Sequence, residues 1–167
     1  YIKDHKFFGM IIPKEFNAHT KNPERGFVSS ANQHPVDPSY PFYVFNDGYE
    51  PYRNRVINDF FNSKEKFTIQ DIKNLQNNNY NLKASELLPN IFDQMDTSTL
   101  SSEEMALYNT IKDWDFNSEV NQLAASIWDL WWKTLYGLTW DEFKSEDIAL
   151  KSPFNYQTIY MLKNYPN

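Results

Sequence analysis

The spacing of apolar residues changes near residue 51, and this change divides the chain into two parts. Before it, short apolar runs at 6–12, 26–30 and 42–45 are separated by Pro, Asn and Gly, which is typical of strands and loops. After it, apolar residues recur every three or four positions, as on one face of a helix. The pattern therefore predicts a strand and loop segment over 1–51 and a helical region over 52–167.

Helical periodicity is clearest in two places, Leu88 to Met95 and Leu123 to Trp131, where apolar side chains fall on one helical face. With the intervening breaks, it predicts helices at 52–62, 68–79, 82–95, 101–113, 120–136, 139–146 and 155–164. No repeat of 20 to 50 residues is present, which argues against a solenoid. The expected fold class is α+β and predominantly helical, with a few short N-terminal strands followed by a bundle-like helical region.

Three of these helices begin with a capping pattern. A Ser or Thr side chain there would accept a backbone N–H, while an acid three residues later returns a hydrogen bond. The pairs are Thr68 with Asp71, Ser101 with Glu104, and Thr139 with Glu142. Apolar residues also flank the second and third pairs as hydrophobic staples. The pattern predicts that helices start at these three positions.

Composition favours one compact globular unit over residues 1–167. Aromatic residues make up 17% of the chain, which supplies apolar area for a core. A net charge of −6 without a basic run argues against nucleic acid or an anionic membrane as partner. No apolar run is long enough for a membrane span, and cysteine is absent. Because the chain begins with Tyr1 and not Met, we expect it to be an excised piece of a longer protein.

The residue pattern does not favour a metal site or a pair of catalytic acids. His5, His19 and His34 are dispersed and lack the spacing of a zinc site, so no metal is predicted. The acid pairs near 103 and 113 are explained by helix ends.

Five tryptophans, at 114, 128, 131, 132 and 140, could form a ligand platform, but their helical spacing favours core positions. Trp128, Trp131 and Trp132 cannot all face one way, so at least one should be partly exposed. An alternative function is therefore a non-catalytic helical module that binds a partner protein or a glycan through an aromatic surface.

Several blocks occur in a fixed order. NPERGFVSSANQHPV is followed by YPFY, EPYRNRV, FTIQDIKNLQ and KDWD, and then by a Trp-rich helix. This order resembles the middle of the large β subunit of the penicillin acylase family of N-terminal nucleophile hydrolases, and it extends over about Gly9 to Trp132. The resemblance implies an αββα enzyme that hydrolyses linear amide C–N bonds of acylated amines, among them β-lactam side chains and acyl-homoserine lactones.

The resemblance also assigns site residues. It implies a serine nucleophile at the start of the β subunit, outside this chain, so that this piece alone should be inactive. Asn32, in the SAN-x-x-P block, matches the family's oxyanion donor, and a neutral amide suits that task because it donates without titrating. Asn32 as a simple turn residue is the other reading. Arg55 matches the family's active-site arginine and would orient Asn32 and its neighbours. A solvated arginine on the helix surface is the other reading.

Partners and location follow from the resemblance as well. The expected partners are the acylated amine substrate, the rest of the β subunit and the α subunit of the same precursor. A structural calcium occurs in some members, but no residue here can be assigned to it, since Asp47 fits a turn better. The aromatic residues Tyr40, Phe42 and Tyr43 fit either a pocket wall or a core. The usual location of the resembled family implies a periplasmic or extracellular parent protein.

Overall fold

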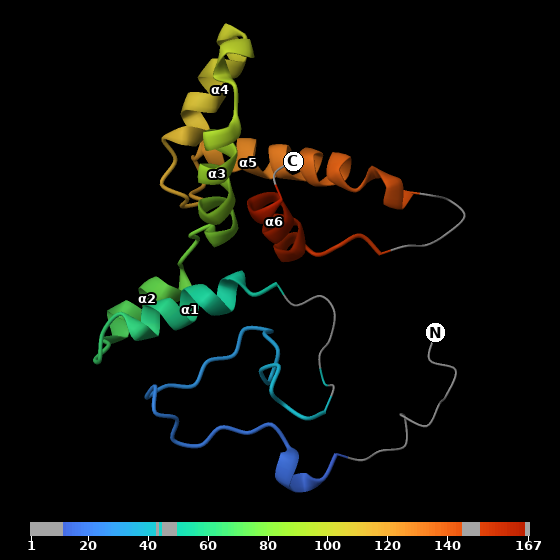
Figure 1. Cartoon of the computed structure of the whole chain (residues 1–167). Coiled ribbons are helices and arrows are strands. Elements are labelled where there is room, and N and C mark those ends of the chain that lie inside the picture. The colour runs from blue at the N-terminus through green and yellow to red at the C-terminus, as the bar shows by residue number, and fades with distance from the viewer. Residues whose placement is uncertain (1–11, 43, 45–49, 145–150, 166–167) are drawn as a thin grey trace.

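A computed structural model describes residues 12–42, 44, 50–144 and 151–165, and this part of the chain is predominantly helical (Figure 1). It contains six α-helices: α1 (Tyr52–Asn62), α2 (Ile69–Gln76), α3 (Leu82–Gln94), α4 (Ser102–Lys112), α5 (Leu123–Thr139) and α6 (Asn155–Asn164). Short 3-10 helices occur at Lys14–Phe16, Thr97–Thr99 and Asp141–Lys144. The predicted predominance of helix is confirmed, although the described residues of the helix predicted at 139–146 form only the 3-10 helix after α5.

The predicted strand at 26–30 is wrong. Within the described residues there is no β-strand, and the one bridge joins Tyr80 to Asn117. Around residue 30 the backbone groups bond to side chains instead: Ala31 N–H donates to Gln33 Oε1, and Gln33 Nε2 donates to the Ser29 carbonyl. A strand needs a neighbouring strand for its ladder, and none is present there. The predicted strands at 6–12 and 42–45 fall largely outside the described residues.

Local capping chemistry accounts for two of the three predicted helix starts. Reciprocal capping boxes form at Thr68 and at Ser101, as predicted. The third prediction, at Thr139, is wrong because α5 continues through this residue. There the Thr139 hydroxyl donates to the Leu135 carbonyl one turn earlier, so it does not cap a new helix.

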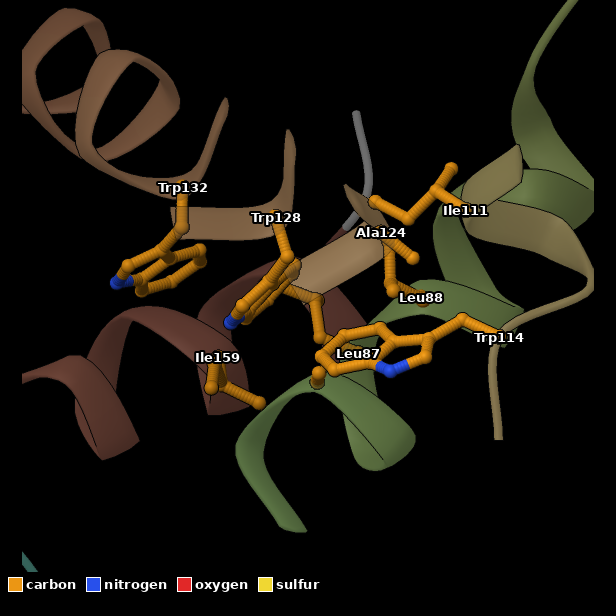
Figure 2. Close-up of a cluster of buried hydrophobic side chains, with 9 residues drawn as sticks. Leu87, Leu88, Ile111, Trp114, Ala124, Trp128, Trp132 and Ile159 are labelled. Carbon is orange, nitrogen blue, oxygen red and sulfur yellow. The ribbon is translucent and has the colours of Figure 1, made fainter. Parts of the chain in front are cut away.

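The hydrophobic core lies where α3, α4, α5 and α6 meet, and Figure 2 shows the side chains that fill it. Each helix supplies apolar residues to it: Ala84, Leu87 and Leu88 from α3, Ile111 from α4, Ala124, Trp128 and Trp132 from α5, and Ile159 from α6, together with Trp114. Two of the three buried indoles donate their N–H within the chain, Trp114 to the Asn117 carbonyl and Trp132 to Asn155 Oδ1. Trp114, Trp128 and Trp132 are therefore core residues and form no exposed platform.

The first two helices differ from the others. Neither α1 nor α2 contributes a fully buried residue. They lie between the N-terminal loop and the remaining helices, and α1 contacts α3 (Figure 1). This position makes α1 the support on which the loop with Asn32 rests.

Candidate functional site

The loop that precedes Asn32 is attached to α1 by side-chain contacts. The Ser29 hydroxyl donates to Asn58 Oδ1 over 2.8 Å, and Asn58 in turn donates to Asn54 Oδ1 one turn earlier on α1. The Phe27 ring stacks on Phe61 with centroids 5.0 Å apart. These contacts fix the course of the chain as it approaches residue 32.

Asn32 has a left-handed backbone, with φ of 61°, and an exposed side chain. Asparagine adopts this conformation more readily than most residues, which explains its use at this bend. Its Oδ1 accepts a hydrogen bond of 2.7 Å from Arg53 Nη2. Since a guanidinium can only donate, the contact fixes the orientation of the amide. The Asn32 NH₂ is then left as a donor that makes no hydrogen bond within the described part of the chain.

Arg53 is thus the arginine that contacts Asn32, whereas the sequence analysis expected Arg55 in that place. Arg55 instead forms an ion pair with Glu86 on α3. That hydrogen bond raises the pKa of the Arg55 guanidinium above its usual value, although partial burial opposes the shift. Residues two positions apart on a helix point about 200° apart, so just one of the two arginines can face the loop. Nothing in the sequence block RNRV says which one does.

A surface cavity of about 640 Å³ opens beside this contact. It is bordered by Ser30 and Ala31, by Tyr52, Arg53 and other α1 residues, and by the segment that joins α2 to α3. Burial, and secondarily Glu50 and Glu86, raises the pKa of the Tyr52 hydroxyl well above its usual value, so this group stays neutral. No local sequence pattern predicts the cavity, because its walls come from four separate stretches of the chain, at 30–31, 52–57, 72–83 and residue 118.

The aromatic residues after the loop form a small cluster of their own. Phe42 packs edge-on against Phe16, with centroids 5.2 Å apart, and against Tyr40. Neither Tyr40 nor Phe42 lines the cavity beside Arg53. Tyr43 lies outside the described residues.

The acids and histidines in the described part of the chain do not gather into a metal site. No group of three or more such side chains lies close enough together there to hold a metal ion. Asp47 lies outside the described residues. In the same described part, no helix has the length and apolarity needed to cross a membrane.

Asn32 does not itself line the cavity, although its partner Arg53 does. An oriented amide NH₂ is the kind of donor that hydrolases aim at a developing oxyanion. The comparison with protein families also indicates a hydrolase. The chain matches the penicillin amidase family over residues 3–166, and it belongs to that family. Comparisons with curated proteins and with solved structures gave no match.

Proposed function

We propose that the protein carrying this chain hydrolyses the linear C–N bond of an acylated amine. The observation that carries the proposal is the Asn32 amide, held by Arg53 with its NH₂ free in a chain of the penicillin amidase family. We further propose that the chain belongs to the β subunit of a self-processed enzyme in the periplasm or outside the cell. The nucleophilic serine would lie at the start of that subunit, outside these 167 residues.

The proposed reaction has two stages. The serine Oγ attacks the amide carbonyl carbon after the α-amine of the serine takes its proton, and the carbonyl oxygen becomes an oxyanion. The Asn32 NH₂ donates to this oxyanion. Collapse of the tetrahedral intermediate breaks the C–N bond, the amine leaves with the proton, and water then hydrolyses the ester. Asn32 is exposed in this chain, so another part of the protein must exclude water for the donor to act at full strength.

The two arginines have separate roles in this proposal. Arg53 holds Asn32 Oδ1 and thereby turns the NH₂ outward. Arg55, which the family resemblance marks as the active-site arginine, acts from the other side of α1 through Glu86. We propose that it organises the site by holding α1 against α3.

The decisive experiment replaces Asn32 in the full-length, processed protein by residues that tolerate its left-handed backbone. Asn32→Gly keeps φ but removes the amide, and Asn32→Asp keeps the oxygen that Arg53 binds while it removes the donor. Both variants should lose about 10² to 10³ in kcat with an unchanged melting temperature. Activity would be measured on a panel of acyl anilides.

A turn residue would behave differently. If Asn32→Gly retains full activity, Asn32 serves the backbone alone and its proposed role is wrong. Binding of a protein or glycan by the chain, with no amide hydrolysis in the parent, would support the non-catalytic alternative. Loss of activity in both variants with an intact fold is expected from the amidase.

A further inference from the structure

Asn32 lies in a described segment that forms neither helix nor strand, so its backbone must be held by other contacts. Arg53 orients the Asn32 side chain, but the direction of a side chain also depends on the backbone from which it projects. Three residues earlier, Ser29 fixes the chain to Asn58 on α1. The contacts between Ser29 and Asn32 therefore decide where the amide NH₂ points.

Gln33 supplies those contacts with its side chain. Its Oε1 accepts from Ala31 N–H over 2.7 Å, and its Nε2 donates to the Ser29 carbonyl over 3.2 Å. In a parallel sheet, one residue of a neighbouring strand would meet a carbonyl and the N–H two residues later in the same way. The Gln33 carboxamide, with one acceptor and one donor side by side, takes the place of that strand.

These two hydrogen bonds depend on the bend at Asn32. The Gln33 side chain reaches back to residues 29 and 31 because the chain turns at Asn32, where φ is 61°. A positive φ is uncommon for residues other than glycine, and it costs free energy unless the surroundings hold it. The two hydrogen bonds hold it here, and without them the backbone of Asn32 can relax toward a negative φ.

The bend is partly shielded from water, which makes its hydrogen bonds hard to replace. Ala31 is 6% exposed and Gln33 is half-buried, whereas Asn32 itself is exposed. A buried N–H that loses its partner costs more than an exposed one, because water cannot easily reach it. Substitution of Gln33 would therefore move the backbone or leave the Ala31 N–H unpaired.

We propose that Gln33 is a positioning residue for the amide hydrolysis, which holds the bend at Asn32 and so fixes the direction in which the NH₂ donates to the oxyanion. Arg53 and Gln33 then have separate tasks. Arg53 sets the rotation of the Asn32 amide group, and Gln33 sets the backbone that carries it. Gln33 touches no reacting atom in this proposal, which rests on the amidase function proposed above.

Gln33→Met tests this role, because it keeps the length of the side chain and removes both hydrogen bonds. In the full-length, processed enzyme it should lower kcat on acyl anilides about tenfold and change KM less than about twofold, since the oxyanion donor acts in the transition state. The melting temperature should fall by no more than about 4 °C. The matched control is Gln70→Met on α2, which loses a hydrogen bond to Asn74 away from the loop and should leave kcat unchanged. An unchanged kcat in Gln33→Met would overturn the proposal.

A double-mutant cycle separates positioning of Asn32 from a general loosening of the loop. If Gln33 acts through Asn32, Gln33→Met should lower kcat about tenfold in the wild-type background but less than about twofold in the Asn32→Gly background, where no amide remains to be oriented. A tenfold loss in both backgrounds would show that Gln33 affects catalysis without Asn32, and the proposal would be wrong.

Hydrogen exchange at the Ala31 N–H tests the hold on the bend without any hydrolysis. In the full-length protein this N–H should exchange at least about tenfold faster in Gln33→Met than in the wild type, and Gln70→Met should leave its exchange unchanged. If Gln33→Met does not speed the exchange, Gln33 does not hold the bend and its proposed role is wrong even when the enzyme cleaves amides. If the exchange is faster but the wild-type enzyme cleaves no amide, the amidase proposal is the one that fails, and the catalytic role of Gln33 fails with it.

Discussion

Two regions of the molecule hold together in different ways. Helices α3 to α6 share a core of Leu, Ile and Trp side chains (Figure 2). The described residues before α3 contain one buried residue, Ala31. There the chain is joined by polar pairs, such as Ser29 with Asn58 and Asn32 with Arg53.

This difference implies that stability depends mainly on the helical core, whereas function depends on the residues around Asn32. Burial of large apolar side chains contributes most of the folding free energy, whereas a single polar pair adds about 1 kcal/mol. Changes in the core should therefore unfold the protein, and changes around Asn32 should alter its function with little loss of stability. The predictions below test that separation.

The largest effect is expected in the core. Trp128→Ala should lower the free energy of unfolding by about 3 to 5 kcal/mol, because it removes a nearly fully buried indole that packs against Trp132. Leu130→Ala on the same helix is the control, since Leu130 is 70% exposed and should change stability by less than about 0.5 kcal/mol. Denaturant unfolding measures both, and similar losses would show that α5 is packed differently.

The next effect is expected at the polar pair. Arg53→Met removes the donor that orients Asn32, so kcat in the full-length enzyme should fall about tenfold while KM and the melting temperature stay nearly constant. Arg53→Lys keeps one donor and should recover part of the activity. A fall in melting temperature that matches the loss of activity would contradict the separation.

A smaller effect is expected at a helix start. Ser101→Ala removes the side chain that accepts from Glu104 N–H in the capping box of α4, and should cost about 1 kcal/mol of stability. Ser102→Ala, one residue later, leaves this box intact and serves as the control. In thermal unfolding, Ser101→Ala should melt at a lower temperature than Ser102→Ala. Equal melting temperatures would show that the capping box adds no stability.

The smallest effect concerns acid. Hydrogen bonds from Lys64 and from Thr68 lower the pKa of Asp71 to about 2. A carboxyl whose pKa is lower in the folded than in the unfolded chain stabilises the fold at pH values above its unfolded pKa, which is near 4 here. This contribution disappears as the pH falls through the folded pKa of about 2. Asp71→Asn should therefore flatten the dependence of stability on pH between about 4 and 2. An NMR titration of Asp71 with an ordinary midpoint would refute the shift.

The helices could be predicted well because their signals are local. The predicted span 52–62 is the observed one, and the capping boxes at Thr68 and Ser101 depend on residues three positions apart. The strand at 26–30 failed because strand formation depends on a partner that no local pattern reveals. At Thr139 the local pattern was ambiguous, since a hydroxyl can bond backward within its helix as well as cap the next one.

The candidate site could be outlined in part from the sequence, and the catalytic role of Asn32 stays a prediction. Asn32 stood out through its sequence block, but the arginine beside it depends on which face of α1 meets the loop. Which arginine faces the loop depends on tertiary packing. The cavity depends on it too, because its walls come from segments between residues 30 and 118. The left-handed backbone of Phe116, with φ of 64°, had no signal at all, since aromatic residues rarely adopt it.

The Glu50 carboxylate, just before α1, accepts hydrogen bonds from the backbone N–H and the side-chain amide of Asn155 at the start of α6, 105 residues away. During synthesis α6 leaves the ribosome last of the described helices. The segment leading into α1, and with it Arg53, can therefore acquire its final anchor only after the other five helices have emerged. The segment that carries Arg53 would therefore complete its folding late in translation, so a chain stalled before residue 155 would hold a partly assembled helical core without the contact between Glu50 and Asn155.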